Sequence, residues 1–156
     1  MKLNLQASAP YFEDLTVGTT FDTNGITLTE DAIIQYALMY DPQPFHVDRS
    51  AGRKAIFGAL VASGFQVLAL SFRAVCDTQV LTNNLGGNQA DDLKWSKPVL
   101  PNDTLKVTGE VVDARDSASK ADRGVLKIKY TTTNDKDEEV CRFTLTHIYR
   151  RRNLRS

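Results

Sequence analysis

The sequence predicts an α+β fold in which one antiparallel sheet wraps around a central, buried helix. Two patterns carry this prediction. A segment near residue 70 is apolar on nearly every helical face, and the second half of the chain alternates apolar and polar residues. Such alternation is typical of half-buried antiparallel strands. We expect a single domain over residues 1–156, because 42% hydrophobic residues suffice for one core and no linker or repeat divides the chain.

The first elements lie before residue 41. Residues 21–27 predict two short extended pieces around the Asn24-Gly25 turn. A helix with an apolar stripe then follows, and Thr29 is its predicted N-cap. Because Pro42 disfavours helical geometry in the preceding residue, this helix should end at Asp41. A carboxylate at a helix C-terminus is electrostatically disfavoured, so we expect the pKa of Asp41 to be raised.

A stiff loop should follow, since residues 40–48 read YDPQPFHVD. Pro42 and Pro44 each fix φ and push the preceding residue away from helical geometry. We therefore expect a rigid, non-helical segment that holds Asp41 and His46 in fixed relative positions. Asp48 can then cap a short turn.

The central helix should run from about Gly64 to Cys76, with Ser63 as its N-cap. A helix that is apolar all round is enclosed by the rest of its fold. Its length of about 20 Å is too short to cross a membrane.

About four antiparallel strands complete the predicted fold. Residues 92–95 form one extended segment, and three alternating stretches follow at 105–111, 126–132 and 141–149. Gly86-Gly87 and Gly124 fit no phosphate-loop pattern, so we interpret them as turn residues.

Composition narrows the functional classes. Nineteen basic residues balance nineteen acidic ones, so no global field favours nucleic acid or an anionic membrane. The basic residues from about 150 to 156 predict a flexible tail, or alternatively a phosphate contact. Two separated cysteines, Cys76 and Cys141, predict free, buried thiols in a reducing cytoplasm. The start lacks a signal-peptide pattern and no apolar run approaches the ~20 residues of a membrane span, so we expect a cytoplasmic protein.

Asp41 and His46 are the first candidates for catalysis. A carboxylate and an imidazole that converge on one water can polarise it and move a proton. Five residue steps allow up to roughly 17 Å between the two Cα atoms, so the loop must bend to bring the side chains together. The alternative is a surface aspartate and a loop histidine that make only local contacts.

The Ser63-Gly64 step is a second candidate. A glycine lets a ligand approach the backbone, and free N–H groups at a helix N-terminus can hold a developing oxyanion. The alternative is a plain N-cap followed by a small residue. His46 and Asp48 could be metal ligands, but no third ligand lies at a recognisable spacing and the other histidine, His147, lies in a predicted strand. We therefore expect no metal.

The chain resembles the MaoC-like dehydratases and (R)-specific enoyl-CoA hydratases, which form a branch of the hot-dog fold. Residues 41–48, DPQPFHVD, are similar to the family motif D-x-N-P-x-H-x-D at the same spacing. Residues 11–18, 57–64 and 93–103 also resemble family segments. Two positions depart from the family: Gln43 stands in place of asparagine in the motif, and Ser63 stands where many relatives have histidine.

The resemblance implies which residues act. Asp41 and His46 would hold the catalytic water, and the N–H of Gly64 would hold the thioester oxygen. Ser63 and Gln43 would lie beside them at the substrate. We expect Asp41 to take a proton from the water, whereas the donor of the proton to C2 stays open between Asp41 and His46.

The implied reaction is (R)-specific hydration of a trans-2-enoyl thioester, or the reverse dehydration of a 3-hydroxyacyl thioester. The substrate would be an acyl-CoA or an acyl carrier protein thioester, with no cofactor, and the chain would form a homodimer or a larger assembly. One alternative is a hot-dog acyl-CoA thioesterase. Another is a non-catalytic subunit that binds acyl thioesters.

Overall fold

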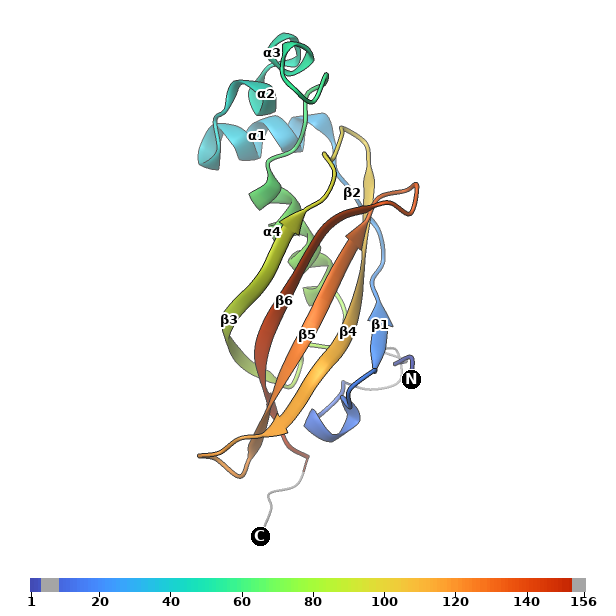
Figure 1. Cartoon of the computed structure of the whole chain (residues 1–156), viewed down its shortest axis with the longest axis vertical. Helices are drawn as coiled ribbons and strands as arrows, with labels where there is room; N and C mark the ends of the chain where they lie inside the picture. Colours follow the sequence, from blue (N-terminus) through green and yellow to red (C-terminus); the bar gives the residue numbers. More distant parts are fainter. Residues whose placement is uncertain (4–8, 153–156) are drawn as a thin grey trace.

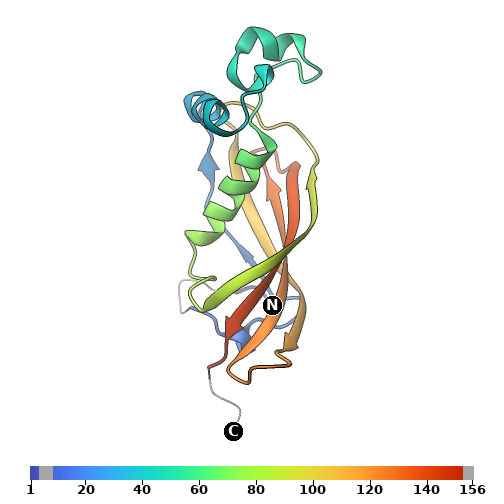
Figure 2. The same ribbon diagram turned by 90° about the vertical axis from the view of Figure 1, so that its left-hand side faces the viewer.

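The computed structural model describes residues 1–3 and 9–152 and shows one antiparallel sheet with a long helix along one face (Figures 1 and 2). The strands follow the order β1-β4-β5-β6-β3, and β2 pairs with β4. All of these pairings are antiparallel, which confirms the predicted α+β class. The bounds are β1 Thr20–Asp22, β2 Ile26–Thr27, β3 Asn84–Trp95, β4 Thr104–Asp116, β5 Arg123–Thr133 and β6 Glu139–Arg150.

The helices divide between one end of the molecule and one face of the sheet. Helices α1, α2 and α3 gather beyond the end of the strands, at the top of Figure 1, whereas α4 runs along the sheet. The bounds are η1 Phe12–Asp14 (a 3-10 helix), α1 Glu30–Tyr40, α2 Pro44–Val47, α3 Arg49–Lys54 and α4 Gly64–Cys76.

Helix α1 begins and ends as predicted. The Thr29 side chain accepts a hydrogen bond from the Ala32 N–H at 3.3 Å, so it is the N-cap. At the other end Asp41 is the C-cap, and its own N–H still donates to the Ala37 carbonyl at 2.9 Å. The proline after Asp41 therefore stops the helix where expected.

The segment after α1 contains a helix, so the prediction of a non-helical loop is wrong. Pro44 begins the single helical turn α2, because the first position of a helix needs no N–H donor and favours the fixed φ of proline. Only the residues before it stay extended, as Gln43 shows with a ψ of 142°. Asp48 caps the next helix, α3, as predicted, and accepts from the Ala51 N–H at 2.6 Å.

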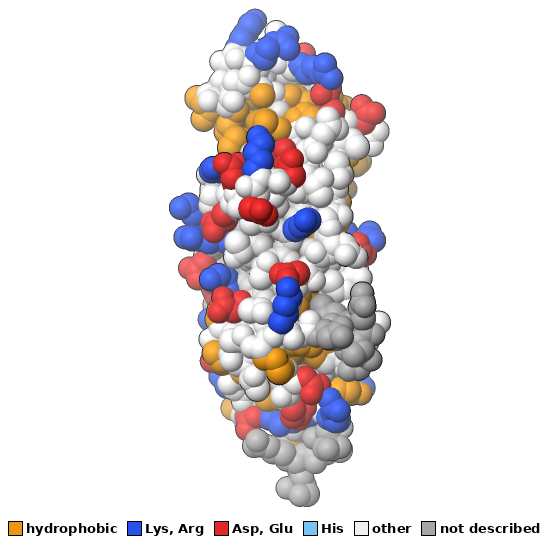
Figure 3. Space-filling view, turned by 90° about the vertical axis from the view of Figure 1, so that its right-hand side faces the viewer, with side chains coloured by type: hydrophobic (Ala, Val, Ile, Leu, Met, Phe, Trp, Pro, Cys, Tyr) orange, Lys and Arg blue, Asp and Glu red, His pale blue; other side chains and the backbone are white. Residues whose placement is uncertain are grey.

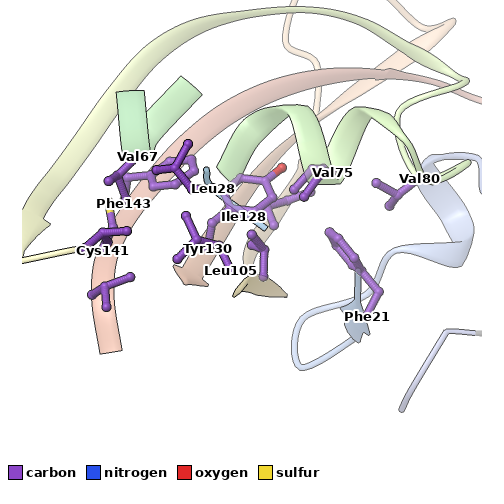
Figure 4. Close-up of a cluster of buried hydrophobic side chains, with 14 of the residues drawn as sticks. Phe21, Leu28, Val67, Val75, Val80, Leu105, Ile128, Tyr130, Cys141 and Phe143 are labelled. Carbon is purple, nitrogen blue, oxygen red and sulfur yellow. The ribbon is translucent and has the colours of Figure 1, made fainter. Parts of the chain in front are cut away.

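The hydrophobic core lies between α4 and the sheet (Figure 4). Val67 and Val75 point from α4 towards Ile128, Tyr130 and Phe143 on strands β5 and β6, and all five side chains are buried. Burial of apolar surface of this kind contributes about 1.5–3 kcal/mol for each large side chain. The core therefore fixes the body of α4 relative to the sheet.

Helix α4 matches its predicted bounds but is not enclosed on every side within this chain. Phe65 is 60% exposed, and Ala69 and Arg73 extend the exposed stripe along the helix. Cys76 ends this stripe and is exposed, so the expectation of two buried thiols holds only for Cys141.

The glycines predicted as turn residues lie inside strands. Gly86 and Gly87 belong to β3, next to bulges where the register with β6 shifts. Gly86 has a φ of +143°, which an L side chain rarely adopts. Gly124 belongs to β5, where the Phe12 ring leaves no space for a Cβ. Strand β3 is consequently far longer than the segment predicted at 92–95.

The basic segment at the C-terminal end is anchored as far as residue 152. Arg150 ends β6, and the Arg151 side chain is buried and makes ion pairs with Glu13 and Asp116. The prediction of a flexible tail from about 150 is therefore wrong for this stretch. The rest of the predicted tail, 153–156, lies outside the described residues.

Acidic and basic side chains are interspersed on the face of the molecule shown in Figure 3, as the zero net charge of the sequence suggests. Within residues 1–3 and 9–152, no helix combines the length and the apolar character that a membrane crossing requires.

Candidate active site

The structure brings Asp41 and His46 together at the junction of α1 and α2. Asp41 ends α1, and a tight turn follows in which the Gln43 N–H donates to the Asp41 carbonyl at 2.8 Å. Helix α2 then turns His46 back, so that its Nε2 lies 3.5 Å from Oδ2 of Asp41. The two side chains are only 16% and 6% exposed. A carboxylate and an imidazole thus share one small, largely buried site.

The backbone fixes the tautomer of the neutral His46 ring. Nδ1 lies 2.7 Å from the Val61 carbonyl oxygen, which can only accept a hydrogen bond. Nδ1 must therefore carry the proton, and Nε2 presents a lone pair towards Asp41. The edge of the Phe45 ring packs against His46 with a centroid distance of 4.5 Å and holds the imidazole plane.

Both oxygens of the Asp41 carboxylate accept hydrogen bonds. Gln43 Nε2 donates to Oδ1 at 2.8 Å, and Ser63 Oγ donates to Oδ2 at 2.6 Å. Burial alone would raise the pKa of Asp41, but the hydrogen bonds from Ser63 and Gln43 and the nearby His46 outweigh it, so the pKa is lowered. We expected this pKa to be raised, and that prediction is wrong. It considered only the helix dipole and not the hydrogen bonds from Ser63 and Gln43. Asp41 is an anion at neutral pH.

Ser63 and Gly64 form the N-terminus of α4 beside this pair. Ser63 is fully buried, and its Oγ also accepts from the Phe65 N–H at 3.3 Å, which confirms the predicted N-cap. Within the described part of the chain, the Gly64 N–H has no hydrogen-bond acceptor. Such free donors at a helix N-terminus attract negative charge.

A cavity of about 420 Å³ opens over these residues. Its wall is largely apolar and includes the polar groups of Asp41 and His46 and, at the N-terminus of α4, Gly64. The residues that line it are Asp41, Gln43, Phe45, His46, Phe57, Val61, Ala62, Gly64, Phe65, Val67, Trp95, Ser96, Lys97, Pro98 and Val99. An apolar cavity with a few convergent polar groups is the usual form of a small-molecule site.

Trp95 is the member of this site that sequence reasoning missed. It ends β3, and its Nε1–H donates to the Gly64 carbonyl at 2.7 Å. The indole lies so close to Gly64 that an added Cβ would be 2.7 Å from ring carbon Cε2. The signal in the sequence was a lone tryptophan directly before the SKPV segment, but only the tertiary contact gives it a role.

The site does not have the ligand set of a metal centre. Among residues 1–3 and 9–152, no three His, Cys, Asp or Glu side chains lie close enough together to hold a metal ion. Asp48, the possible partner of His46 in a metal pair, instead caps α3.

With this geometry established, comparison with known proteins places the chain in a family. Residues 13–135 match the model of the MaoC-like domain, so the chain belongs to the MaoC-like domain family. The chain is 29% identical to the uncharacterized protein YdeM of Bacillus subtilis over 140 residues, which cover 89% of this chain and 98% of YdeM.

Solved structures agree with this assignment. The crystal structure of the MaoC-like dehydratase from Rhodospirillum rubrum superposes with a TM-score of 0.87 at 33% identity, and the match covers 94% of this chain and all of that one. The R-hydratase PhaJ1 from Pseudomonas aeruginosa gives a TM-score of 0.68 at 19% identity, over 92% of this chain and 86% of that one. The second likeness shows the fold alone. The fold is thus the hot-dog fold of the MaoC-like proteins, as the sequence predicted.

Proposed function

We propose that this protein catalyses the (R)-specific hydration of trans-2-enoyl thioesters and the reverse dehydration of 3-hydroxyacyl thioesters. One observation carries the proposal: the Asp41 carboxylate and the lone pair of His46 Nε2 are two hydrogen-bond acceptors 3.5 Å apart at the wall of an apolar cavity. A water between two acceptors donates both of its hydrogens to them. Its oxygen lone pair then points away from the pair, towards a substrate in the cavity.

The proton goes to His46 in this proposal, in place of the Asp41 acceptor that we expected from the sequence. Hydrogen bonds from Ser63 and Gln43 lower the pKa of Asp41 and so weaken its carboxylate as a base. Nε2 of His46 takes one proton as the water oxygen bonds to C3. The Asp41 carboxylate orients the water and stabilises the imidazolium that forms.

The second half of the reaction places the proton on C2. Addition to C3 moves the electrons of the double bond towards the thioester oxygen, and the free N–H of Gly64 stabilises the negative charge there. The imidazolium of His46 then returns its proton to C2, so hydrogen and hydroxyl are added on the same face. The loss of one oxyanion donor typically costs about 100- to 1,000-fold in kcat.

The R configuration and the thioester substrate follow from the family resemblance, and the R-hydratases among the structural neighbours support them. The apolar lining of the cavity fits an acyl chain. The R. rubrum neighbour is itself described as a dehydratase, which supports the same class of reaction.

A homodimer is part of the proposal. Strand β3 is an edge of the sheet, its last residue Trp95 is 41% exposed, and Phe65 of α4, which packs against Trp95, is 60% exposed. Exposed apolar side chains next to an open sheet edge favour association with another chain. Two structural neighbours from Mycobacterium tuberculosis support association: one is described as having a double hot-dog fold, and the other is a chain of the ChsH1–ChsH2 complex.

Incubation of the pure protein with crotonyl-CoA tests the proposal. Loss of the enoyl absorbance without release of free thiol supports hydration, and Asp41→Asn and His46→Ala should each abolish it with little change in the melting temperature. Release of thiol would instead indicate a thioesterase. Trp95 is the only tryptophan of the chain and lies in the cavity wall, so a change in its fluorescence without turnover would indicate a binding subunit.

A further inference from the structure

We propose that Trp95 is a positioning residue that fixes the N-terminus of α4 for the reaction at Asp41 and His46. The inference rests on the hydration proposed above and adds a residue to it. Trp95 does not reach the Asp41–His46 pair by any hydrogen bond of its own within the described structure; it acts through the peptide group between Gly64 and Phe65.

That peptide group is held at both ends. The indole Nε1–H of Trp95 donates to its carbonyl oxygen, on Gly64, at 2.7 Å. Its N–H, on Phe65, donates to Ser63 Oγ at 3.3 Å. Ser63 in turn donates to the Asp41 carboxylate at 2.6 Å. A continuous chain of hydrogen bonds therefore leads from the indole to the acid, and bonds in such chains polarise one another.

Gly64 needs an external restraint because of its own backbone. Glycine has the largest conformational freedom of any residue, yet the proposed mechanism requires the Gly64 N–H to stay aimed at one oxygen. A larger residue here would have to displace the indole, since its Cβ would lie 2.7 Å from the ring. The indole thus packs against the bare Cα and binds the carbonyl, which restricts the rotation that glycine would otherwise have.

The restraint comes from a rigid part of the fold. Trp95 is the last residue of β3 and pairs with Cys141 on β6, an interior strand of the sheet. The next residue, Ser96, still donates its N–H to the Val140 carbonyl at 2.9 Å. The edge-to-face contact between Phe65 and Trp95, with a centroid distance of 5.4 Å, adds a second link between helix and strand. Through Trp95, the sheet therefore sets the position of the N-terminus of α4.

The alternative is that the indole only covers Gly64 and that its N–H has no effect on the reaction. A phenyl ring would then serve as well, since it also covers Gly64 but has no N–H. Trp95→Phe removes the donor and keeps an aromatic ring. We expect kcat to fall about fivefold, the effect of one neutral hydrogen bond, while KM changes less than about twofold. We also expect the Phe65 amide hydrogen to exchange faster with solvent by about fivefold or more.

Leu93→Ala is the matched control. Leu93 lies two residues earlier on the same strand and is similarly exposed, but it lines no part of the cavity. It should leave kcat and the Phe65 exchange rate unchanged. Thermal melts of both variants establish that each is folded.

The experiment measures crotonyl-CoA hydration and hydrogen exchange by NMR on the wild type and both variants. A selective fall in kcat with faster Phe65 exchange supports the proposal. Full activity in Trp95→Phe, or a change confined to KM, overturns it and leaves the hydratase function standing. If the wild type hydrates no enoyl thioester, the proposed function fails, and with it any role for Trp95 in that reaction. Unchanged Phe65 exchange in Trp95→Phe would show in any case that the indole does not fix the helix tip.

Discussion

Replacement of Ser63 by alanine removes the shortest hydrogen bond to Asp41. In the wild type, Ser63 Oγ donates to Oδ2 at 2.6 Å in a fully buried position, so solvent cannot readily take its place. A hydrogen bond to a charged group stabilises it by about 1.5–3 kcal/mol, and one pKa unit corresponds to about 1.4 kcal/mol. The pKa of Asp41 should therefore rise in Ser63→Ala, because the carboxylate loses that stabilisation. Loss of the N-cap should also lower the free energy of unfolding by about 1 kcal/mol.

Titration of the Asp41 carboxyl followed by NMR measures this change directly, separately from the protonation of the base His46. The carboxyl should titrate below its ordinary pKa of 3.8 in the wild type and at a higher pH in Ser63→Ala, because the serine donor is gone. Ser71→Ala is a matched control: Ser71 is a buried serine of the same helix whose Oγ donates to the Val67 carbonyl. Its loss should lower stability without moving the titration of Asp41. An unchanged Asp41 titration in Ser63→Ala would refute our account of the Asp41 carboxylate.

Three further outcomes follow from other contacts. Gly64→Ala should displace Trp95, because the new Cβ would lie 2.7 Å from the indole; we expect a stability loss of about 1–3 kcal/mol in a thermal melt and at least a tenfold loss of activity. Burial lowers the pKa of His147 to about 4. Between about pH 6.5 and 4 the unfolded chain therefore binds more protons than the folded one, so the free energy of unfolding should fall by up to about 3 kcal/mol as the pH is lowered through this range. Denaturant titrations across this range should show that slope in the wild type and a flatter one in His147→Gln. Arg151→Ala should lower the melting temperature and reduce the free energy of unfolding by about 1–2 kcal/mol, because it removes a buried guanidinium that packs over the Phe12 ring. An unchanged melting temperature would show that this end of the chain is not anchored.

The elements set by local sequence were predictable. The caps at Thr29 and Ser63 and the end of α1 before Pro42 depend on residues that are neighbours in the chain, and all three are confirmed. Strand β3 was too short in the prediction because its first half contains Gly86 and Gly87. Glycine pairs usually mark turns, whereas here the bulges and the pairing with β6 keep them in the strand.

The meeting of Asp41 and His46 was predictable from the sequence, whereas the electrostatics of the candidate site and the contact of Trp95 were not. The spacing of Asp41 and His46 drew attention to the pair, and the fold brings them within 3.5 Å of each other. The direction of the Asp41 pKa depends on Ser63, which is 22 positions away in the sequence. The contact of Trp95 with Gly64 likewise joins residues 31 positions apart. Tertiary contacts of this kind leave no periodic or local signal in a single sequence.

The stereochemical course of the reaction in D2O tests the central proposal most directly. If Asp41 and His46 hold one water and return its proton to the same face, crotonyl-CoA should give (R)-3-hydroxybutyryl-CoA with one deuterium at C2, added syn to the hydroxyl. NMR of the isolated product gives the configuration at C2 relative to C3, and chromatographic comparison with R and S standards gives the absolute configuration at C3. An S product, addition of hydroxyl and deuterium to opposite faces, or unchanged substrate would contradict the proposed arrangement.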